Sequence, residues 1–170
     1  MSDPQNFSAN PARHPDSYPT QHSPAPRKPV AIGLVSVQQD GELRAVTERE
    51  HHGTLYERDG AHYLLYDDEG TATTLRLASE EIRIYRRGAE MNSWQVFQLG
   101  EITGGRLVLG AGEMMLGVMT SHFSLQQDGQ AGRVELHYEL FTAESAEPDA
   151  DPMGLSLGKF ELAMDWQARA

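Results

Sequence analysis

One arginine in a short alternating run has a type and position that point to chemistry. Ile82 and Ile84 share one face of an expected strand, and Arg86 continues that face because alternate strand residues point to the same side. A guanidinium that faces an apolar interior is costly unless an anion pairs with it, and its planar fork suits a carboxylate or a phosphate. We therefore expect Arg86 to anchor a small anionic ligand, to form an internal ion pair with an acidic side chain, or to lie at a rim in water.

Two hydroxyl groups are expected on the same inner side. Thr120 continues the apolar face set by residues 114 to 118, and Tyr138 lies on the apolar face of residues 134 to 140. Buried hydroxyls need hydrogen-bond partners. Thr120 and Tyr138 are therefore candidates to orient a ligand beside Arg86, with ordinary core hydroxyls that pair inside the protein as the alternative.

Other chemistries lack the residues that they need. Without cysteine, the chain has no thiolate nucleophile, disulfide or cysteine-ligated metal. His51 and His52 are adjacent, so as strand residues they point to opposite faces, whereas a metal site needs at least three converging ligands. The acidic loop of residues 143 to 154 lacks the alternating ligands and central glycine of a calcium loop, so a solvated linker is expected there. The glycine-rich run at residues 110 to 112 fails as a dinucleotide motif and predicts a bend between strands. No catalytic constellation is visible in the sequence, and we expect no metal and no cofactor.

The elements that carry these residues are strands. Apolar and polar residues alternate in short runs, which is typical of antiparallel strands. Asp40-Gly41, Asp59-Gly60 and Asp128-Gly129 each separate two runs, because tight hairpin turns need residues that tolerate positive φ. A one-residue change of phase at Gly158 predicts a β-bulge. Residues 42 to 52 alternate poorly and would also suit a helix. The expected strands are residues 30–37, 42–57, 61–67, 72–78, 82–87, 93–99, 101–110, 113–126, 132–142 and 155–166.

The first 29 residues differ in composition from the rest. They hold seven of the nine prolines and no Leu, Ile or Val, so residues 1–29 are expected to form a disordered tail and residues 30–170 the folded domain. Fourteen Lys and Arg against 25 Asp and Glu give a net charge of −11, which disfavours nucleic acid and anionic membrane surfaces as partners. Because no secretion signal and no run of 18 apolar residues is present, a cytoplasmic protein without a membrane span is expected.

Closure of the sheet is the expected architecture. Eight to ten meandering antiparallel strands predict an all-β closed barrel, because closure removes the exposed edges that would template aggregation. The interior of an eight-stranded barrel is either filled by side chains or wide enough for one small ligand. The architecture is therefore compatible with a binding function.

Residues 53 to 66, with the sequence GTLYERDGAHYLLY, and the Thr73-Thr74 pair that follows resemble the YwiB-like family of bacterial calycin-type barrels. The likeness spans residues 30 to 166 and implies a closed antiparallel barrel similar to lipocalins and fatty-acid-binding proteins. It also implies a cytoplasmic bacterial protein whose family has no established activity. The chain departs from the family at Leu107, where an aromatic residue is expected, and at residues 110 to 112, where a Thr-aromatic-Gly stretch is expected. The downstream landmarks of the likeness are Arg86-Arg87-Gly88, Met91, Phe97, Gly100, Gly112, Thr120 and Tyr138.

We therefore expect a non-catalytic, calycin-like barrel that binds a small apolar or amphipathic ligand, including an anionic one, at Arg86, Thr120 and Tyr138. The alternative is a filled barrel that acts as a protein-interaction module without a small-molecule ligand. A third option is a hydrolase or isomerase that uses residues of the cavity. A lumen of a few hundred cubic ångströms would favour the first hypothesis, whereas close packing would favour the second. The sequence does not fix the ligand, the protein partners or the oligomeric state.

Overall fold

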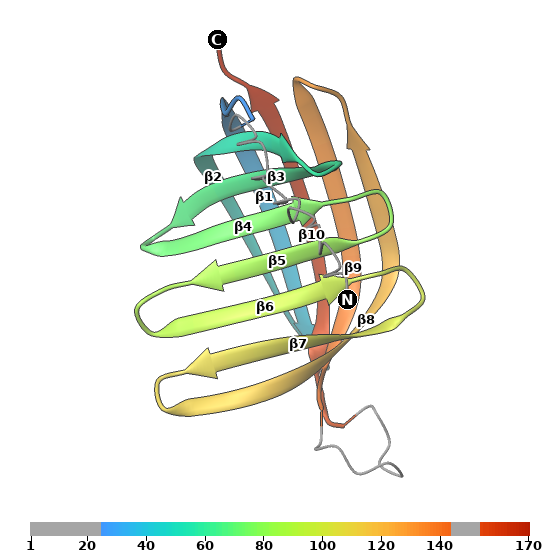
Figure 1. Ribbon diagram of the computed structural model, residues 1–170. Coiled ribbons are helices and arrows are strands. Elements are labelled where there is room, and N and C mark those ends of the chain that lie inside the picture. Colours follow the sequence, from blue (N-terminus) through green and yellow to red (C-terminus); the bar gives the residue numbers. More distant parts are fainter. Residues whose placement is uncertain (1–24, 144–153) are drawn as a thin grey trace, which may run out of the picture.

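The computed structural model describes residues 25–143 and 154–170 (Figure 1). Most of the expected proline-rich tail, residues 1–24, and the acidic loop, residues 144–153, lie outside the described residues. The first strand begins at Lys28 rather than at Val30.

The described residues form one closed antiparallel barrel of ten strands, which confirms the expected fold class. Each strand pairs with its neighbours along the chain, and β1 pairs with β10 to close the ring. Within the described ranges, no helix is long and apolar enough to cross a membrane. The strands are β1 (Lys28–Asp40), β2 (Leu43–Arg58), β3 (Ala61–Asp68), β4 (Thr71–Leu77), β5 (Ile82–Arg87), β6 (Met91–Phe97), β7 (Ile102–Leu109), β8 (Gly112–Gln127), β9 (Ala131–Thr142) and β10 (Ser156–Ala168).

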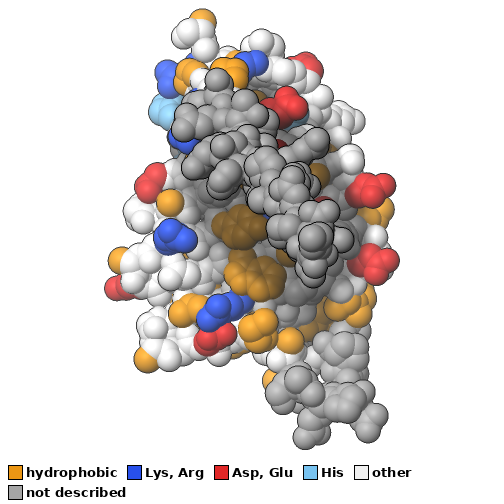
Figure 2. Space-filling model, in the orientation of Figure 1, with side chains coloured by type: hydrophobic (Ala, Val, Ile, Leu, Met, Phe, Trp, Pro, Cys, Tyr) orange, Lys and Arg blue, Asp and Glu red, His pale blue; other side chains and the backbone are white. Residues whose placement is uncertain are grey.

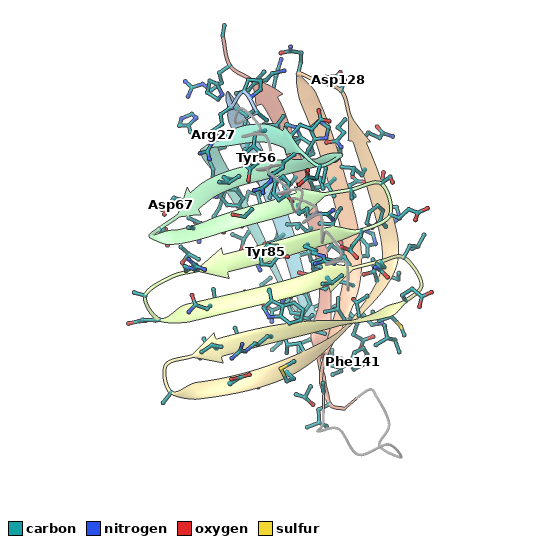
Figure 3. The ribbon with its side chains drawn as sticks, viewed as in Figure 1. Arg27, Tyr56, Asp67, Tyr85, Asp128 and Phe141 are labelled. Carbon is teal, nitrogen blue, oxygen red and sulfur yellow. The ribbon has the colours of Figure 1, made fainter. Side chains whose placement is uncertain are left out.

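The three expected hairpin turns connect β1 to β2, β2 to β3 and β8 to β9. Gly41 has a φ of 59° and Gly60 a φ of 77°, the left-handed conformation that glycine adopts without strain. In the β8–β9 turn the Asp128 carboxylate (Figure 3) accepts hydrogen bonds from the backbone N–H groups of Gln130 and Ala131, at 2.7 and 2.9 Å. These hydrogen bonds lower the pKa of Asp128 from its usual value.

Two β-bulges change the phase of the inner face. The register between β10 and β9 shifts between Ser156 and Gly158, and Gly158 has a φ of 118°, so the predicted bulge is confirmed. A second shift lies between Thr120 and His122 of β8. The sequence did not predict it, because the residues on both sides of Ser121 look equally strand-like.

Residues 43–52 belong to a strand and not to a helix, and Glu42 lies in the turn before it. They form the first part of β2, which pairs with β1 from Leu43 to Leu55 but with β3 only from Gly53 onward. Leu43 and Val46 are 77% and 51% exposed, so neither face of this half-strand is consistently buried. Its poor alternation follows from this lack of a buried face.

The inner faces of two groups of strands make the core. Figure 1 shows β3 to β7 crossing in front of β1 and β8 to β10. Hydrogen-bonded neighbours place Leu77 beside Ile82 and Ile82 beside Phe97, and all three are fully buried. Burial decreases along the inner face toward the opposite ends of these strands, where the β3–β4, β5–β6 and β7–β8 turns lie. We call that end of the inner face the mouth of the barrel.

Candidate functional site

A row of polar side chains crosses the inner face just inside the mouth. Hydrogen-bonded pairing places Tyr66 opposite Thr73, Thr73 opposite Arg86, and Arg86 opposite Ser93. We call these four residues the polar row. The neighbouring inner positions farther from the mouth are apolar in β3, β4 and β5, so the polar row borders the packed core.

Arg86 lies on the inner face, as the alternation of β5 predicts. Ile82 and Ile84 are buried, Arg86 is half-buried, and the intervening Tyr85 is exposed. Its positive charge acts on the phenols of both Tyr66 and Tyr138, on either side of the interior. No ion pair or side-chain hydrogen bond of Arg86 is formed among residues 25–143 and 154–170. The arginines that do form ion pairs in these ranges are Arg49, Arg58, Arg76, Arg83, Arg106 and Arg133.

Tyr66 lies at one end of the polar row, opposite Thr73. Its side chain is only 8% exposed, and burial raises its pKa above the usual value of 10.0, although the charge of Arg86 and a hydrogen bond with Thr73 oppose that shift. The phenol is therefore protonated at neutral pH. His51 stacks on its ring at a centroid distance of 4.8 Å and fixes its orientation.

Tyr138 approaches the polar row from β9. Its ring makes an edge contact with Phe97 at 4.7 Å and stacks on Phe160 at 5.3 Å. Burial raises the pKa of Tyr138, and the nearby charge of Arg86 partly opposes the shift. Its phenol is thus a second neutral donor within reach of the Arg86 charge.

Several buried polar atoms on the inner face have no hydrogen-bond partner in the described part of the chain. Thr120, which pairs with Tyr138 across β8 and β9, is 1% exposed and its Oγ1 is unpartnered. Gln95, next to the polar row in β6, has an unpartnered Oε1. A buried hydroxyl or amide without a partner costs about 1–3 kcal/mol, so water or a ligand that completed these hydrogen bonds would stabilise the protein.

Asp68, whose charge acts on Tyr66 of the polar row, has its own cationic partner. Asp68 Oδ1 lies 3.2 Å from Arg49 Nη1 and 3.9 Å from His51 Nε2. The same arginine atom lies 3.1 Å from Glu69 Oε1. The negative charge at this edge of the mouth is therefore partly neutralised, whereas the Arg86 charge is not.

Apolar side chains border the polar row on the inner face: Leu107 and Met114 extend it sideways onto β7 and β8, and Met91 and Leu109 lie nearer the rim. Ser93 pairs with Leu107 and Leu107 with Met114, while Met91 pairs with Leu109. We call these four apolar residues, Met91, Leu107, Leu109 and Met114, the apolar lip. Leu109 is 54% and Met114 40% exposed. Apolar inner-face residues left in solvent beside a cationic group can accept the apolar part of an amphipathic molecule.

The three residues predicted from the sequence all lie on the inner face. The structure brings Arg86 and Tyr138 within electrostatic reach and places Thr120 beside Tyr138. The prediction did not assign Tyr66 to the site, and it did not include Thr73 or Ser93. The tight turn at Glu69-Gly70 is the signal that could have found two of them, because it fixes the register that sets Tyr66 opposite Thr73.

No group of three or more His, Asp or Glu side chains is arranged to hold a metal ion in the described ranges. His51 points inward and His52 outward, where His52 Nδ1 lies 3.1 Å from Arg169 Nη1. His122 and His137 are neighbours on the outer face, with ring centroids 4.7 Å apart. Their proximity follows from the unexpected bulge at Ser121.

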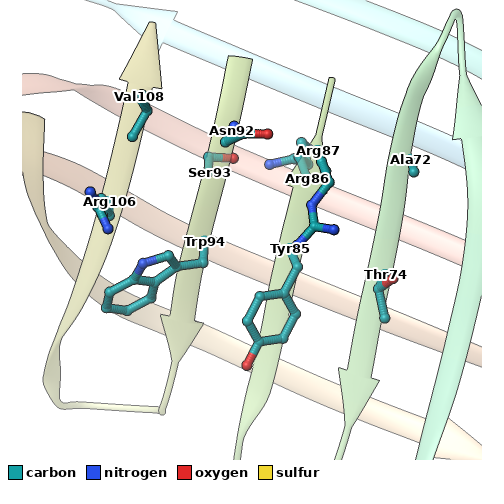
Figure 4. A pocket seen from close by; sticks show the side chains of 10 residues that line it. All are labelled: Ala72, Thr74, Tyr85, Arg86, Arg87, Asn92, Ser93, Trp94, Arg106 and Val108. Atoms are coloured by element: carbon teal, nitrogen blue, oxygen red, sulfur yellow. The ribbon is translucent and has the colours of Figure 1, made fainter. Parts of the chain in front are cut away.

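A groove of about 760 Å³ runs along the outer face of β4 to β7 (Figure 4). Figure 4 shows the Tyr85 phenol and the Trp94 indole beside each other on neighbouring strands. Arg86 and Ser93 also border this groove, although strand alternation points their side chains to the inner face. Its lining residues are Ala72, Thr74, Tyr85, Arg86, Arg87, Asn92, Ser93, Trp94, Arg106 and Val108.

Comparison with known proteins supports the resemblance noted in the sequence. The chain is 28% identical over 124 residues to the uncharacterized beta-barrel protein YwiB of Bacillus subtilis, covering 70% of this chain and 86% of that protein. The crystal structure of the same protein superposes with a TM-score of 0.70 at 19% identity, covering 85% of this chain and 94% of the other. At that identity the superposition shows a common fold. Residues 32–150 match the family model DUF1934, described as a domain of unknown function. The chain therefore belongs to the DUF1934 family of YwiB-like barrel proteins.

Proposed function

We propose that this protein is a calycin-like, cytoplasmic binding protein that holds a small amphipathic anion at the mouth of its barrel. The observation that carries the proposal is the half-buried guanidinium of Arg86, which faces the interior without a carboxylate partner among the described residues. A partly desolvated, unpaired charge destabilises a folded protein, and an anionic ligand would compensate for it.

The surroundings of Arg86 favour an anion with several acceptor atoms. The phenols of Tyr66 and Tyr138 are protonated donors at neutral pH, because burial raises both pKa values. Thr73 and Ser93 add hydroxyl groups on the two strands that flank Arg86. A planar guanidinium with neutral donors around it suits a carboxylate or phosphate group, whose oxygens accept short charge-assisted hydrogen bonds.

The apolar lip supplies the second half of the recognition. Its residues lie beside the polar row and between it and the rim, so an anionic group at Arg86 would leave the rest of the ligand against methionine and leucine side chains. Methionine adapts its shape to different apolar partners at small energetic cost. The ligand class is therefore a short-chain carboxylate or a phosphate monoester with an apolar chain, bound head inward.

Thermal unfolding with three matched probes tests the proposal. Octanoate and octyl phosphate should raise the melting temperature, whereas octanol, which has the same chain and no charge, should raise it much less. Native mass spectrometry of the protein as purified should show an additional small molecule that is lost in Arg86→Met. Equal shifts for octanol and the two anions, or no shift with any probe, would contradict the proposal.

A second candidate function is a protein-interaction module, and the packing of the core favours it. The inner positions farthest from the mouth are fully buried, including Leu77, Ile82 and Phe97, so this end of the interior is filled by side chains. In that case the outer surface would carry the function. An absence of any probe effect, together with a bound protein partner that is lost when Trp94 is replaced, would support this alternative.

A further inference from the structure

The outer groove presents two aromatic rings on neighbouring strands. Pairing between β5 and β6 sets Tyr85 directly opposite Trp94 on the outer face, and Tyr85 is 40% exposed. Trp94 extends over the next strand at Gly104, where an added Cβ would lie 3.7 Å from Trp94 Cη2, an ordinary van der Waals contact. Figure 2 shows hydrophobic side chains gathered in the middle of this face of the molecule. The aromatic pair is therefore a platform on the outside of the barrel, on the opposite face of the sheet from the lumenal site, and Arg86 and Ser93 border both.

The groove is also locally cationic on a chain of net charge −11. Arg87 and Arg106 lie beside the aromatic pair. Arg106 is held by Glu113 at 2.8 Å. Arg87 is exposed and makes no ion pair among residues 25–143 and 154–170. Such a groove suits an extended segment with proline and aromatic residues and a small negative charge.

The chain enters the described part of the structure on the same outer surface. Ala25 and Pro26 border a pocket with Leu55 and Tyr56 of β2. The guanidinium of Arg27 lies 5.3 Å from the centre of the Tyr56 ring (Figure 3). Three strand spacings, about 14 Å, separate β2 from β5. In a polyproline II conformation, at about 3.1 Å per residue, a few residues preceding Ala25 are enough to reach the groove.

We propose that residues 1–24 of the same chain dock in this outer groove as a polyproline-type segment. They contain five prolines, Phe7 and Tyr18 but no Leu, Ile or Val. Their charged residues are Asp3, Asp16 and Arg13, which give a net charge of −1 opposite the groove's arginines. Proline-rich segments bind grooves lined by aromatic side chains because their extended conformation is already formed and little entropy is lost. The occupant of the groove is thus the chain's own N-terminal segment.

Paramagnetic broadening in the full-length protein tests this docking. The chain has no cysteine, so Ser17→Cys gives a single site for a nitroxide spin label. We expect loss of the Trp94 indole N–H signal and of the Tyr85 amide signal. The amide of Ala163, on the outer face of β10, should keep its intensity. A second label at Asn10→Cys repeats the measurement in case the first label itself blocks docking.

Two variants and one mixture complete the test. In the labelled chain, Trp94→Ala should restore the signals of the groove, whereas Val46→Ala, which removes an exposed apolar side chain from β2, should leave them broadened. Broadening of equal size in β5 and β10, or broadening that persists in Trp94→Ala, would overturn the proposal. The mixture combines chains that carry the spin label but no ¹⁵N with ¹⁵N-labelled chains that carry no spin label. Broadening of the ¹⁵N signals in this mixture would identify a second copy as the occupant and would also overturn the proposal.

Discussion

Replacement of Arg86 by methionine tests two effects of the guanidinium separately: the loss of stability caused by its unpaired charge, and its contribution to ligand binding. Methionine keeps an unbranched apolar side chain but removes the guanidinium. No carboxylate within the described ranges pairs with Arg86, so the variant leaves no partner charge exposed to an apolar environment. We expect the ligand-free variant to be more stable than the wild type by about 1 kcal/mol, near the low end for such replacements because Arg86 is only half-buried.

The same variant should lose most of its response to an anionic probe. At a concentration about 100 times the Kd, octyl phosphate would stabilise the wild type by about 2.7 kcal/mol, roughly 8 °C for a domain of this size. Loss of charge-assisted hydrogen bonds worth about 2 kcal/mol weakens binding about 30-fold. The probe would then contribute only about 0.9 kcal/mol, roughly 3 °C.

Differential scanning calorimetry of wild type, Arg86→Met and Arg87→Met measures these shifts. Arg87 is the matched control, because it follows Arg86 in β5 but points to the outer face. Its replacement should leave the probe response at the wild-type value. An equal response in all three proteins would refute the role of Arg86. A ligand-free Arg86→Met variant that is several kcal/mol less stable would show that the guanidinium has a structural partner.

Three further predictions concern the interior and one ion-pair cluster. Gly132→Ala should lower the unfolding free energy in urea by about 3 kcal/mol, because its Cβ would lie 2.1 Å from Trp166 Cζ2; Gly112→Ala, whose nearest neighbour would be 3.5 Å away, should change it little. Thr120→Val should raise the unfolding free energy by about 1 kcal/mol, because it removes a buried unpartnered hydroxyl, and a decrease would reveal a hidden partner. Hydrogen bonds from Arg83 and Gln98 lower the pKa of Glu81 below its ordinary 4.5, so its stabilisation is present above that pH and is lost as the pH falls through the lowered value. The stability difference between wild type and Glu81→Gln should therefore shrink in urea titrations below pH 4.5, and a constant difference would contradict the assignment.

The face on which a residue lies could be predicted where a strand has one fully buried side. Ile82 and Ile84 mark the inner face of β5 clearly, so the inward position of Arg86 follows from alternation alone. The first half of β2 has no such face, since it lacks β3 as a partner before Gly53, and its sequence fits a helix as well as a strand. Alternation is informative only where the fold buries one side.

The partners of a residue across strands were harder to predict than its face. The polar row exists because tight turns set the register of β3, β4, β5 and β6, and a shift of one residue would turn Tyr66 outward. The bulge at Ser121 also changes which residues are cross-strand partners. A single extra residue brings His122 next to His137, and this extra residue has no distinct sequence signal. The outer groove was missed for the same reason, because it needs Tyr85 and Trp94 in register.

The most direct test of the lumenal anion site is the NMR signal of the Arg86 guanidinium in the wild-type protein. During titration with octyl phosphate, we expect the Arg86 Nε–H signal to shift and its exchange with water to slow, and we expect no such change with octanol. An Arg86 signal that stays at its starting position while octyl phosphate binds elsewhere would contradict it.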